Sequence, residues 1–549
     1  MMNLIIKNGR IVDGTGNASY YGDVGIFNGK IAGIGNLSRT TAEKIINADG
    51  LAVAPGFVDI HSHADFIIPL PDHAGILEPL LLQGITTLVT GNCGLSPAPV
   101  NPEHLELLKS YTRFFQGGEL SWDWTTMKEY LEKLAKKGVG FNVIPLVSHG
   151  AVRIAVMGFE IGPPSSEQLS SMKELVAQSL ENGAFGLSAG LIYAPGMYAS
   201  TDELIEISKP LIPHRAVFTC HVRGSSETGI SSTKEIIEIA RQNGIPVEHS
   251  HIEEFGEPYW EKIDEVIALH QEAREEGLDL TFDVIPYTAA NTTLTACFPP
   301  YAFEGGIERF IEKLKDHKER QRLRFDIENM ASEWPTWRPG TWPHNLVRAT
   351  GWKNIWLLWV PGKKNSRFQG KNFEEIGQTR GEIPFDAACD ILIEEKGAAL
   401  ALFVGVSGDL ENDEGLKKFL ICPDGAINTD AILTGRGLPH PAAYGAFPRV
   451  LGQYVREQKL MRLEEAVRKM TSLPLNRFSI HDRGLIKPGM CADITIFNPD
   501  TVRDNATYMK PVSPPTGIEF VFINGKVAVE HGRPVKEVLA GSVLSRSNQ

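Results

Sequence analysis

The feature that most constrains the fold is a regular alternation of apolar segments and helical patterns in the middle of the chain. Apolar segments that end in a polar residue or glycine lie at 52–63, 85–93, 141–149, 184–193, 216–222, 245–251, 280–287 and 418–424. Amphipathic helical patterns, such as 165–183 and 232–244, separate most of them. This alternation predicts a parallel sheet, and eight strands fit a (β/α)8 barrel. Because residues 402–409 are a ninth candidate strand, the identity of the eight stays open.

Both ends of the chain have a different pattern. Segments 4–14, 23–35, 489–500 and 518–534 alternate apolar and polar residues, and glycine or Asn-Gly turns lie within or between them. This pattern is typical of β-hairpins. We therefore predict one β domain built from residues 1–54 and 484–549, around a catalytic barrel at 55–483. Residues 295–380, rich in Trp, Pro and basic side chains, are predicted to form an inserted subdomain or lid over the barrel mouth.

Composition narrows the class of protein. The 549 residues are 42% hydrophobic and carry 54 basic and 67 acidic side chains, a net charge of −13. An acidic chain of this kind argues against a general nucleic-acid binder. The N-terminal apolar stretch is too short for a secretory signal, and no segment approaches the roughly 20 apolar residues of a membrane span. With six scattered cysteines, we expect a cytoplasmic protein with reduced thiols and no membrane partner.

Histidine and cysteine recur where the predicted strands end. His61 and His63 are two residues apart, so on a strand both side chains point to the same face. Cys93 follows the second strand, His221 ends the fifth and His251 ends the sixth, although His249 competes with His251. Cys93 alone could be an apolar filler. Since barrel active sites lie at the carboxyl ends of the strands, their joint occurrence predicts a metal site, with zinc as the metal.

Two further patterns bear on the chemistry. Asp424 ends the last candidate strand, where a carboxylate could bind the metal or deprotonate its water, or could simply begin a turn before Gly425. Residues 186–190 match the G-x-S-x-G motif of serine hydrolases. That motif requires a strand–turn–helix context, whereas residues 191–199 look like strand and loop. The small residues at 186–190 are better explained by close packing inside the barrel.

Several blocks of sequence together resemble one family. Segments 8–16, 54–63, 84–94 and 186–199, with 446–457, 463–474, 483–497 and 522–528 near the end, are similar to the N-acyl-D-amino-acid deacylase (D-aminoacylase) branch of the amidohydrolases. The resemblance covers nearly the whole chain. It implies a (β/α)8 barrel, a β-sandwich domain formed from both termini and a small insert.

The resemblance also implies a division of the metal site. Cys93, His221 and His251 would hold one zinc tightly, and Cys93 would replace the carbamylated lysine of many relatives. His61, His63 and Asp424 would form a second, weaker site. Asp424 would act as the catalytic base and then as the acid.

The sequence departs from the family pattern where the α-carboxylate of a substrate would bind. The family's His-Pro-Arg triplet reads His440-Pro441-Ala442, and its Tyr-Pro-Tyr motif reads Ile285-Pro286-Tyr287. A family serine is replaced at or near Asn291. A bidentate arginine is hard to replace in this role, although Arg436 is near enough in sequence to substitute.

We therefore predict a zinc-dependent amidohydrolase that cleaves the amide bond of an N-acylated, amino-acid-like small molecule. The candidate substrate-binding residues are Tyr193, Ser188, Tyr287, Asn291, Arg436 and His440. The alternatives are an amide, ester or lactone substrate without the α-carboxylate, a metal-assisted lyase or retro-aldol reaction, and a non-enzymatic binding protein with a relic site. The sequence does not determine the oligomeric state.

Overall fold

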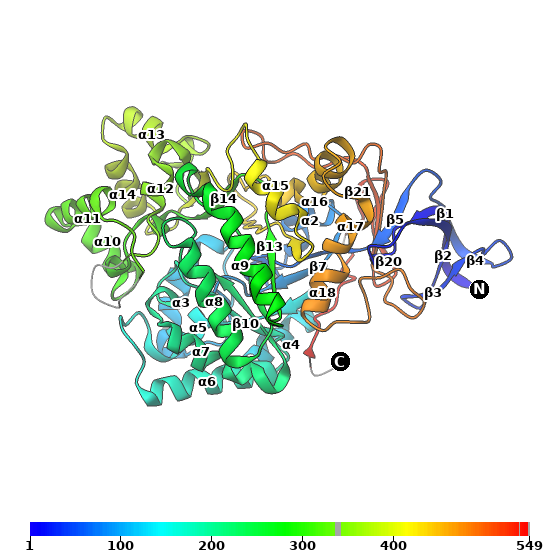
Figure 1. Cartoon of the computed structure of the whole chain (residues 1–549), viewed down its shortest axis with the longest axis horizontal. Helices are drawn as coiled ribbons and strands as arrows, with labels where there is room; N and C mark the ends of the chain where they lie inside the picture. The colour runs from blue at the N-terminus through cyan, green and yellow to red at the C-terminus, as the bar shows by residue number, and fades with distance from the viewer. Residues whose placement is uncertain (335–341, 537, 547–549) are drawn as a thin grey trace.

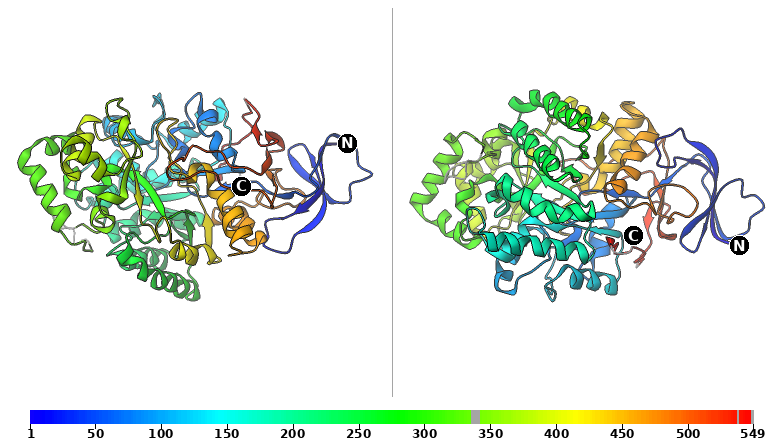
Figure 2. Two further views of the ribbon diagram at one scale, coloured as in Figure 1. Left: turned by 90° about the horizontal axis from the view of Figure 1, so that it is seen from above. Right: turned by 60° about the horizontal axis from the view of Figure 1, so that its bottom comes forward.

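The computed structural model describes residues 1–334, 342–536 and 538–546. The barrel occupies the centre of the molecule, with an inserted helical unit at one end and a β domain carrying the N-terminus at the other (Figure 1). The two further views show the same order of the three parts (Figure 2).

The barrel has eight strand positions. Sheets β6-β7-β8 and β9-β10-β11-β12-β13-β17 are parallel, and β8 leads directly into β9. A parallel bridge between Ser62 and Ala431 joins the chain after β6 to the chain after β17 and closes the ring. The strands are β6 (Phe57–Asp59), β7 (Ile85–Thr90), β8 (Asn142–Pro145), β9 (Val147–Ser148), β10 (Gly186–Gly190), β11 (Val217–His221), β12 (Val247–His249), β13 (Leu280–Val284) and β17 (Gly425–Ile427).

Helices cover the outside of the barrel. The pattern at 165–183 forms α6 (Ser166–Glu181), which begins with a capping box between Ser165 and Gln168. The pattern at 232–244 lies in α8 (Gly229–Asn243), which ends at a left-handed Gly244. The other helices around the barrel include α4 (Met127–Lys137), α5 (His149–Met157), α7 (Thr201–Ser208), α9 (Ile263–Glu275), α15 (Glu414–Ile421), α16 (Ala442–Arg449), α17 (Leu463–Lys469) and α18 (Ser472–Arg477).

The predicted eighth strand at 418–424 is wrong. Most of that segment belongs to α15, in which Leu416, Phe419 and Leu420 are buried at helical spacing. The eighth strand is β17, which begins only after Asp424. The ninth candidate, at 402–409, is not a barrel strand either. Its first part lies in β16 (Leu400–Val404), which pairs antiparallel with β14 (Ala289–Thr293) and β15 (Ile355–Trp359).

The inserted unit is wider than the predicted 295–380. Its three-stranded sheet begins with β14 and ends with β16, so the unit runs from about residue 289 to 404. Its helices are α10 (Ile307–Lys315), α11 (His317–Asn329), α12 (Leu346–Thr350), α13 (Phe373–Arg380) and α14 (Pro384–Glu394). Residues 335–341 of the predicted lid lie outside the described residues.

One sheet combines both ends of the chain, as predicted. Its central pairing is between β5 and β18, which join the N-terminal and C-terminal strands antiparallel. A core that includes Leu4, Ile26, Ile494 and Phe522 lies within this domain. The strands are β1 (Met2–Ile11), β2 (Tyr20–Phe27), β3 (Lys30–Gly35), β4 (Ala42–Asn47), β5 (Ala52–Pro55), β18 (Ile494–Phe497), β19 (Ile518–Ile523), β20 (Lys526–Glu530) and β21 (Arg533–Pro534).

The described helices do not include one with the length and apolar character needed to cross a bilayer.

A buried ion pair connects the β domain to the barrel. Arg483 Nη1 lies 2.6 Å from Asp493 Oδ2, and both side chains are at most 5% exposed. Asp493 also accepts hydrogen bonds from the side chain of Asn142 in β8, at 3.0 Å, and from the backbone N–H of Asn524, at 2.7 Å. One carboxylate therefore holds a barrel strand and the β19–β20 turn together.

We expect Asp493→Ala to lower the free energy of unfolding by about 3–5 kcal/mol, because Arg483 would keep only the exposed Asp482 as an ion-pair partner among the described residues, and Asn142 and the Asn524 N–H would lose their buried acceptor. Urea denaturation followed by circular dichroism measures the loss. The matched control is Asp482→Ala. Asp482 lies 3.1 Å from the same guanidinium, but its side chain is 56% exposed, so its loss should cost at most about 1 kcal/mol. Equal effects of the two substitutions would contradict the argument.

Candidate metal centre and active site

Four strand ends bring histidine and cysteine side chains to one point. His61 and His63 follow β6, Cys93 follows β7, His221 ends β11 and His251 follows β12. The Cys93 Sγ atom lies 3.1 Å from His61 Nε2, 3.6 Å from His221 Nδ1 and 3.5 Å from His251 Nε2. Two groups of three potential ligands share this sulfur: His61, His63 and Cys93, and Cys93, His221 and His251.

The spacing of these atoms fits a metal ion. A tetrahedral zinc with Zn–S and Zn–N bonds of about 2.3 and 2.0 Å places sulfur and nitrogen about 3.5 Å apart. The two contacts from Cys93 to His221 and His251 agree with that value. In addition, the Oδ1 atom of Asp430, which faces the Nε2 atoms of His61 and His63, is buried without a well-aligned hydrogen-bond partner among the described residues. Buried polar atoms without partners are rare in native proteins.

Close backbone packing helps to place the thiol. Cys93 has a φ of +52° and is followed by Gly94, also at positive φ. A Cβ atom on Gly190, at the end of β10, would overlap the carbonyl oxygen of Cys93. Only glycine leaves room for this approach. The small residues at 186–190 thus serve strand packing, and the Ser188 hydroxyl donates a hydrogen bond to Gly91 O and accepts one from Gly94 N.

The electrostatics of the cluster favour an ionised thiol. Burial opposes ionisation of Cys93, but the charge of His61 and hydrogen bonds from His221 and His251 outweigh it, so the pKa of the thiol lies well below its usual value. Burial, followed by the charge of His251, lowers the pKa of His221. Burial opposes ionisation of His61, His63 and His251 as well, but their contacts with Cys93 and the neighbouring carboxylates outweigh it and raise their pKa values. Since zinc binds thiolate and neutral imidazole, it would take the ionised Cys93 directly and displace the protons of these three rings.

The carboxylate of the site is Asp430, and the prediction of Asp424 is wrong. Asp430 follows β17, and its Oδ1 lies 3.1 Å from His63 Nε2 and 3.5 Å from His61 Nε2. Asp424 precedes β17 at the opposite end of the barrel, where it pairs with Arg274. The error follows from assigning α15 as a strand, because this placed Asp424 at a carboxyl end. The better signal was the polar run 428–430 after the apolar pair at 426–427.

The structure distinguishes His251 from His249. His249 ends β12, and its ring hydrogen-bonds His270 of α9 at 3.1 Å, on the outside of the barrel. His251 lies beyond the strand at a φ of +33°. The positive φ breaks the alternation of a strand, so the two rings do not share a face.

Two aspartates that sequence reasoning missed support the ligands. Asp283 Oδ1, from β13, accepts a hydrogen bond from His251 N at 2.7 Å and another from the side chain of Asn428, and lies 3.6 Å from His61 Nδ1. Asp59, at the end of β6, accepts hydrogen bonds from the N–H and hydroxyl of Thr429. Each carboxylate links a ligand-bearing strand end to its neighbour. The sequence did contain a signal for both residues, because Asp59 and Asp283 are acidic residues within otherwise apolar strands.

A narrow cavity adjoins the cluster, and two of the predicted substrate-binding residues line it. These are Tyr193, whose hydroxyl lies 2.7 Å from Thr292 Oγ1, and Asn291 of β14. The inserted unit contributes much of the wall. The cavity is lined by Ile192, Tyr193, His221, His251, Glu253, Phe255, Ala290, Asn291, Thr292, His344, Leu346, Phe403 and Asp430.

The remaining predicted binding residues have other surroundings. The Tyr287 hydroxyl donates to Asp504 Oδ2 at 2.7 Å, so it is already paired. His440 is held between Ala289 O, 3.0 Å from Nε2, and the N–H of Ala442, which donates to Nδ1 at 3.0 Å. Arg436 is exposed and does not line the cavity. None of these three lines that cavity, although Tyr287 and Ile285 line a second, smaller cavity beside His251 and Glu253.

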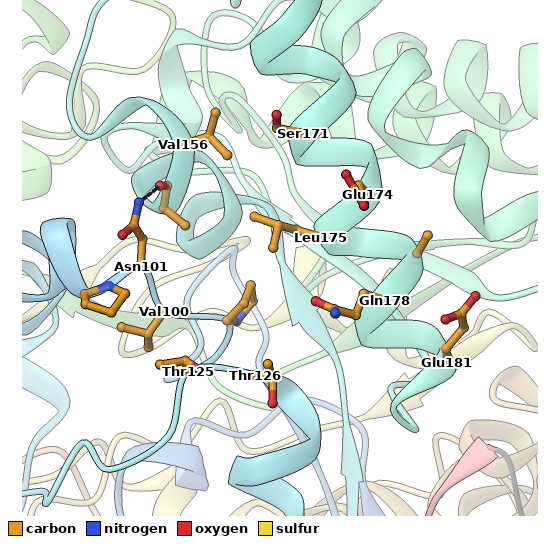
Figure 3. A pocket seen from close by; sticks show the side chains of 14 residues that line it. Val100, Asn101, Thr125, Thr126, Val156, Ser171, Glu174, Leu175, Gln178 and Glu181 are labelled. Carbon is orange, nitrogen blue, oxygen red and sulfur yellow. Dashed lines mark hydrogen bonds between the residues drawn. The ribbon is translucent and has the colours of Figure 1, made fainter.

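A larger hollow lies on the outer surface, away from the metal cluster. Val100, Asn101, Thr125 and Thr126 line one side, and residues of α6 such as Leu175 line the other (Figure 3). Its lining contains neither histidine nor cysteine among the described residues. Size alone therefore does not identify the reactive site.

Comparisons with known proteins agree with this geometry. The sequence profile of the amidohydrolase family matches residues 44–313 and 427–529. The chain is 29% identical to D-aminoacylase of Alcaligenes xylosoxydans xylosoxydans, over 99% of this chain and 98% of that one. It is 30% identical to N-acyl-D-glutamate deacylase of the same organism, over 95% and 93%.

Comparison with solved structures also finds D-aminoacylase and N-acyl-D-glutamate deacylase. A D-aminoacylase crystal structure superposes with a TM-score of 0.80 at 29% identity, covering 99% of this chain and all of that one. N-acyl-D-glutamate deacylase from Bordetella bronchiseptica, complexed with zinc and a phosphonate inhibitor, gives a TM-score of 0.79 at 28% identity, over 99% of each chain. A binuclear metal centre is described for D-aminoacylase.

The chain belongs to the amidohydrolase family and, within it, to the D-aminoacylase branch. It is a metal-dependent amidohydrolase that resembles the N-acyl-D-amino-acid deacylases.

The geometry predicts which substitutions remove the metal. Cys93→Ala and His221→Ala should each lose most of the metal that the wild-type protein retains after dialysis, because each removes a ligand of the same ion. Inductively coupled plasma mass spectrometry measures the ratio of metal to protein. His249→Gln is the matched control, since His249 faces His270 outside the barrel, and it should retain the metal. Unchanged metal in Cys93→Ala would contradict the assignment.

Proposed function

We propose that this protein is a zinc-dependent hydrolase that cleaves the amide bond of an N-acylated, amino-acid-like small molecule. The observation that carries the proposal is the convergence of five histidine and cysteine ligands with Asp430 beside one cavity. They lie at the carboxyl ends of barrel strands, where enzymes of this fold carry their active sites.

The ligands divide into two groups in this proposal. Cys93, His221 and His251 would hold one zinc ion tightly, and His61, His63 and Asp430 would form a second, weaker site. When bound, zinc supplies a Lewis acid that polarises an amide carbonyl and makes water more acidic. The histidines and Cys93 then serve to fix the position of that acid against the cavity.

Asp430 is the proton carrier in this mechanism. Burial opposes its ionisation, but the hydrogen bond with His63 and the charges of His61 and His63 hold its pKa below the usual value. An ionised carboxylate can take a proton from the attacking water. It then gives that proton to the nitrogen of the leaving amine, which completes the hydrolysis.

Tyr193 is placed to stabilise the transition state. Its ring packs edge-on against His221, with 5.1 Å between ring centroids. Burial, followed by the charge of Cys93, raises the pKa of the Tyr193 hydroxyl well above its usual value, so it stays protonated. A protonated hydroxyl that lines the cavity can donate a hydrogen bond to the carbonyl oxygen as negative charge develops there.

The decisive test compares the two aspartates. Asp430→Asn should lower kcat/KM by about 10²–10⁴-fold, the usual contribution of a general acid–base group. The metal bound by Cys93, His221 and His251 should remain, as mass spectrometry can verify. Asp424→Asn is the matched control and should retain activity, because Asp424 lies at the other end of β17.

The assay uses N-acetyl-D-amino acids and their uncharged amides, with release of the free amine as the readout. Hydrolysis in ¹⁸O-labelled water should place the label in the carboxylic acid product, which a lyase would not do. Full activity in Asp430→Asn, or a product free of label, would overturn the mechanism.

A further inference from the structure

The cavity beside the metal ligands has an unusual balance of charge. Two carboxylates, Glu253 and Asp430, line it, but no lysine or arginine does so within the part of the chain that the structure describes. Asp430 lies against His61 and His63, so it belongs to the metal site. Glu253 is the additional negative charge. Apart from the zinc ion itself, the described part of the wall thus offers a substrate carboxylate no lysine or arginine, and Glu253 would repel it.

Two other arginines, Arg449 and Arg223, are engaged elsewhere. Arg449 lies 3.6 Å from Asp504 and 4.5 Å from the ring of Tyr287. Arg223 pairs with the buried Glu235 at 2.9 Å. Neither lines the cavity, and the exposed Arg436 does not line it either.

Glu253 has a fixed place in the wall. It follows β12 by four residues, is 8% exposed, and its Oε1 lies 3.6 Å from His251 Nδ1. The opposite nitrogen of that ring, Nε2, faces Cys93. Glu253 therefore supports a ligand histidine and also forms part of the cavity wall.

Asn291 provides a neutral hydrogen-bonding group in the same cavity. Its side chain is 5% exposed, and neither Nδ2 nor Oδ1 has a hydrogen-bond partner among the described residues. A buried amide without partners is costly. Because an amide offers two donors and one acceptor, it is best satisfied by a ligand group that both accepts and donates.

The rest of the wall is mainly apolar. Ile192, Phe255, Leu346 and Phe403 line it. Such side chains suit an aliphatic or aromatic group of the bound molecule. The cavity thus combines an apolar wall, an unpaired amide and a carboxylate.

From this lining we infer that the substrate carries a neutral carboxamide, or another uncharged or cationic hydrogen-bonding group, at the carbon next to the scissile nitrogen, in place of a carboxylate. Asn291 and Glu253 determine this specificity. The inference rests on the proposed amide hydrolysis and names the class of substrate for it.

The test uses substrates that differ only in this group. N-acetyl-D-methionine and N-acetyl-D-methioninamide are compared on the zinc-loaded full chain, with the L forms as a second pair. The amide should have the higher kcat/KM, by at least about tenfold. Calorimetry with the products should give the same order, with methioninamide binding more tightly than methionine.

Two variants assign the preference to residues. Glu253→Gln should raise kcat/KM for the acid, because it removes the repulsion between Glu253 and the substrate carboxylate. The ratio of kcat/KM for the amide to kcat/KM for the acid should then fall. Asn291→Leu should lower kcat/KM for the amide more than for the acid, which also narrows the preference for the amide. The matched control is Glu254→Gln. Glu254 is the chain neighbour of Glu253 and is also buried, but it packs near Gly229 and does not line the cavity, so the ratio should stay as in the wild type. All activities are normalised to bound zinc.

The outcomes are distinct. Equal or better hydrolysis of the acid overturns the inference and leaves the proposed amide hydrolysis standing. If the amide is preferred but neither Glu253→Gln nor Asn291→Leu changes the ratio, the assignment to these residues is wrong. If neither compound of either pair is hydrolysed, the proposed function fails, and the inference fails with it.

Discussion

The active site depends on a thiolate buried among imidazoles. Cys93 is 3% exposed, and three histidine rings approach its sulfur within 3.6 Å. An unpaired charge in this position would be very costly, so the surrounding groups must compensate it. The requirement explains why the strand ends meet so closely, why glycine is needed at Gly190, and why Asp59 and Asp283 link the strand ends that carry the ligands. A metal ion completes the compensation and gains a rigid set of ligands.

The three parts of the molecule have separate tasks around this point. The barrel provides the candidate metal ligands and Asp430, the proposed proton carrier. The inserted unit closes the cavity with residues such as Asn291, Leu346 and Phe403. The chain between β18 and β19 reaches the barrel through Asp504, which pairs with the Tyr287 hydroxyl. The cavity wall therefore combines residues of the barrel loops, such as Tyr193 and Glu253, with residues of the inserted unit.

The departures from the family pattern have a structural explanation. Ala442 is fully buried at the start of α16, and the Gln83 side chain donates a hydrogen bond to its carbonyl oxygen. Tyr287 and Arg449 are occupied by Asp504. The arginine expected at position 442 is thus absent, and the Tyr287 hydroxyl is already paired. The relatives identify the family as metal-dependent amidohydrolases, whereas the residues that line the cavity come from the structure of this chain.

The sequence by itself determined the barrel, the β domain from both termini and the five histidine and cysteine residues. It could do so because strand periodicity and ligand type are local properties. It misplaced the carboxylate, since the apolar residues of α15 resemble a short strand and only the pairing of β17 with β13 shows where the strand begins. The choice of His251 over His249 likewise depended on one positive φ. Only the tertiary structure showed that the Tyr287 hydroxyl is paired with Asp504, which lies more than two hundred positions away in the sequence. It also showed that the Asn291 side chain has no hydrogen-bond partner among the described residues.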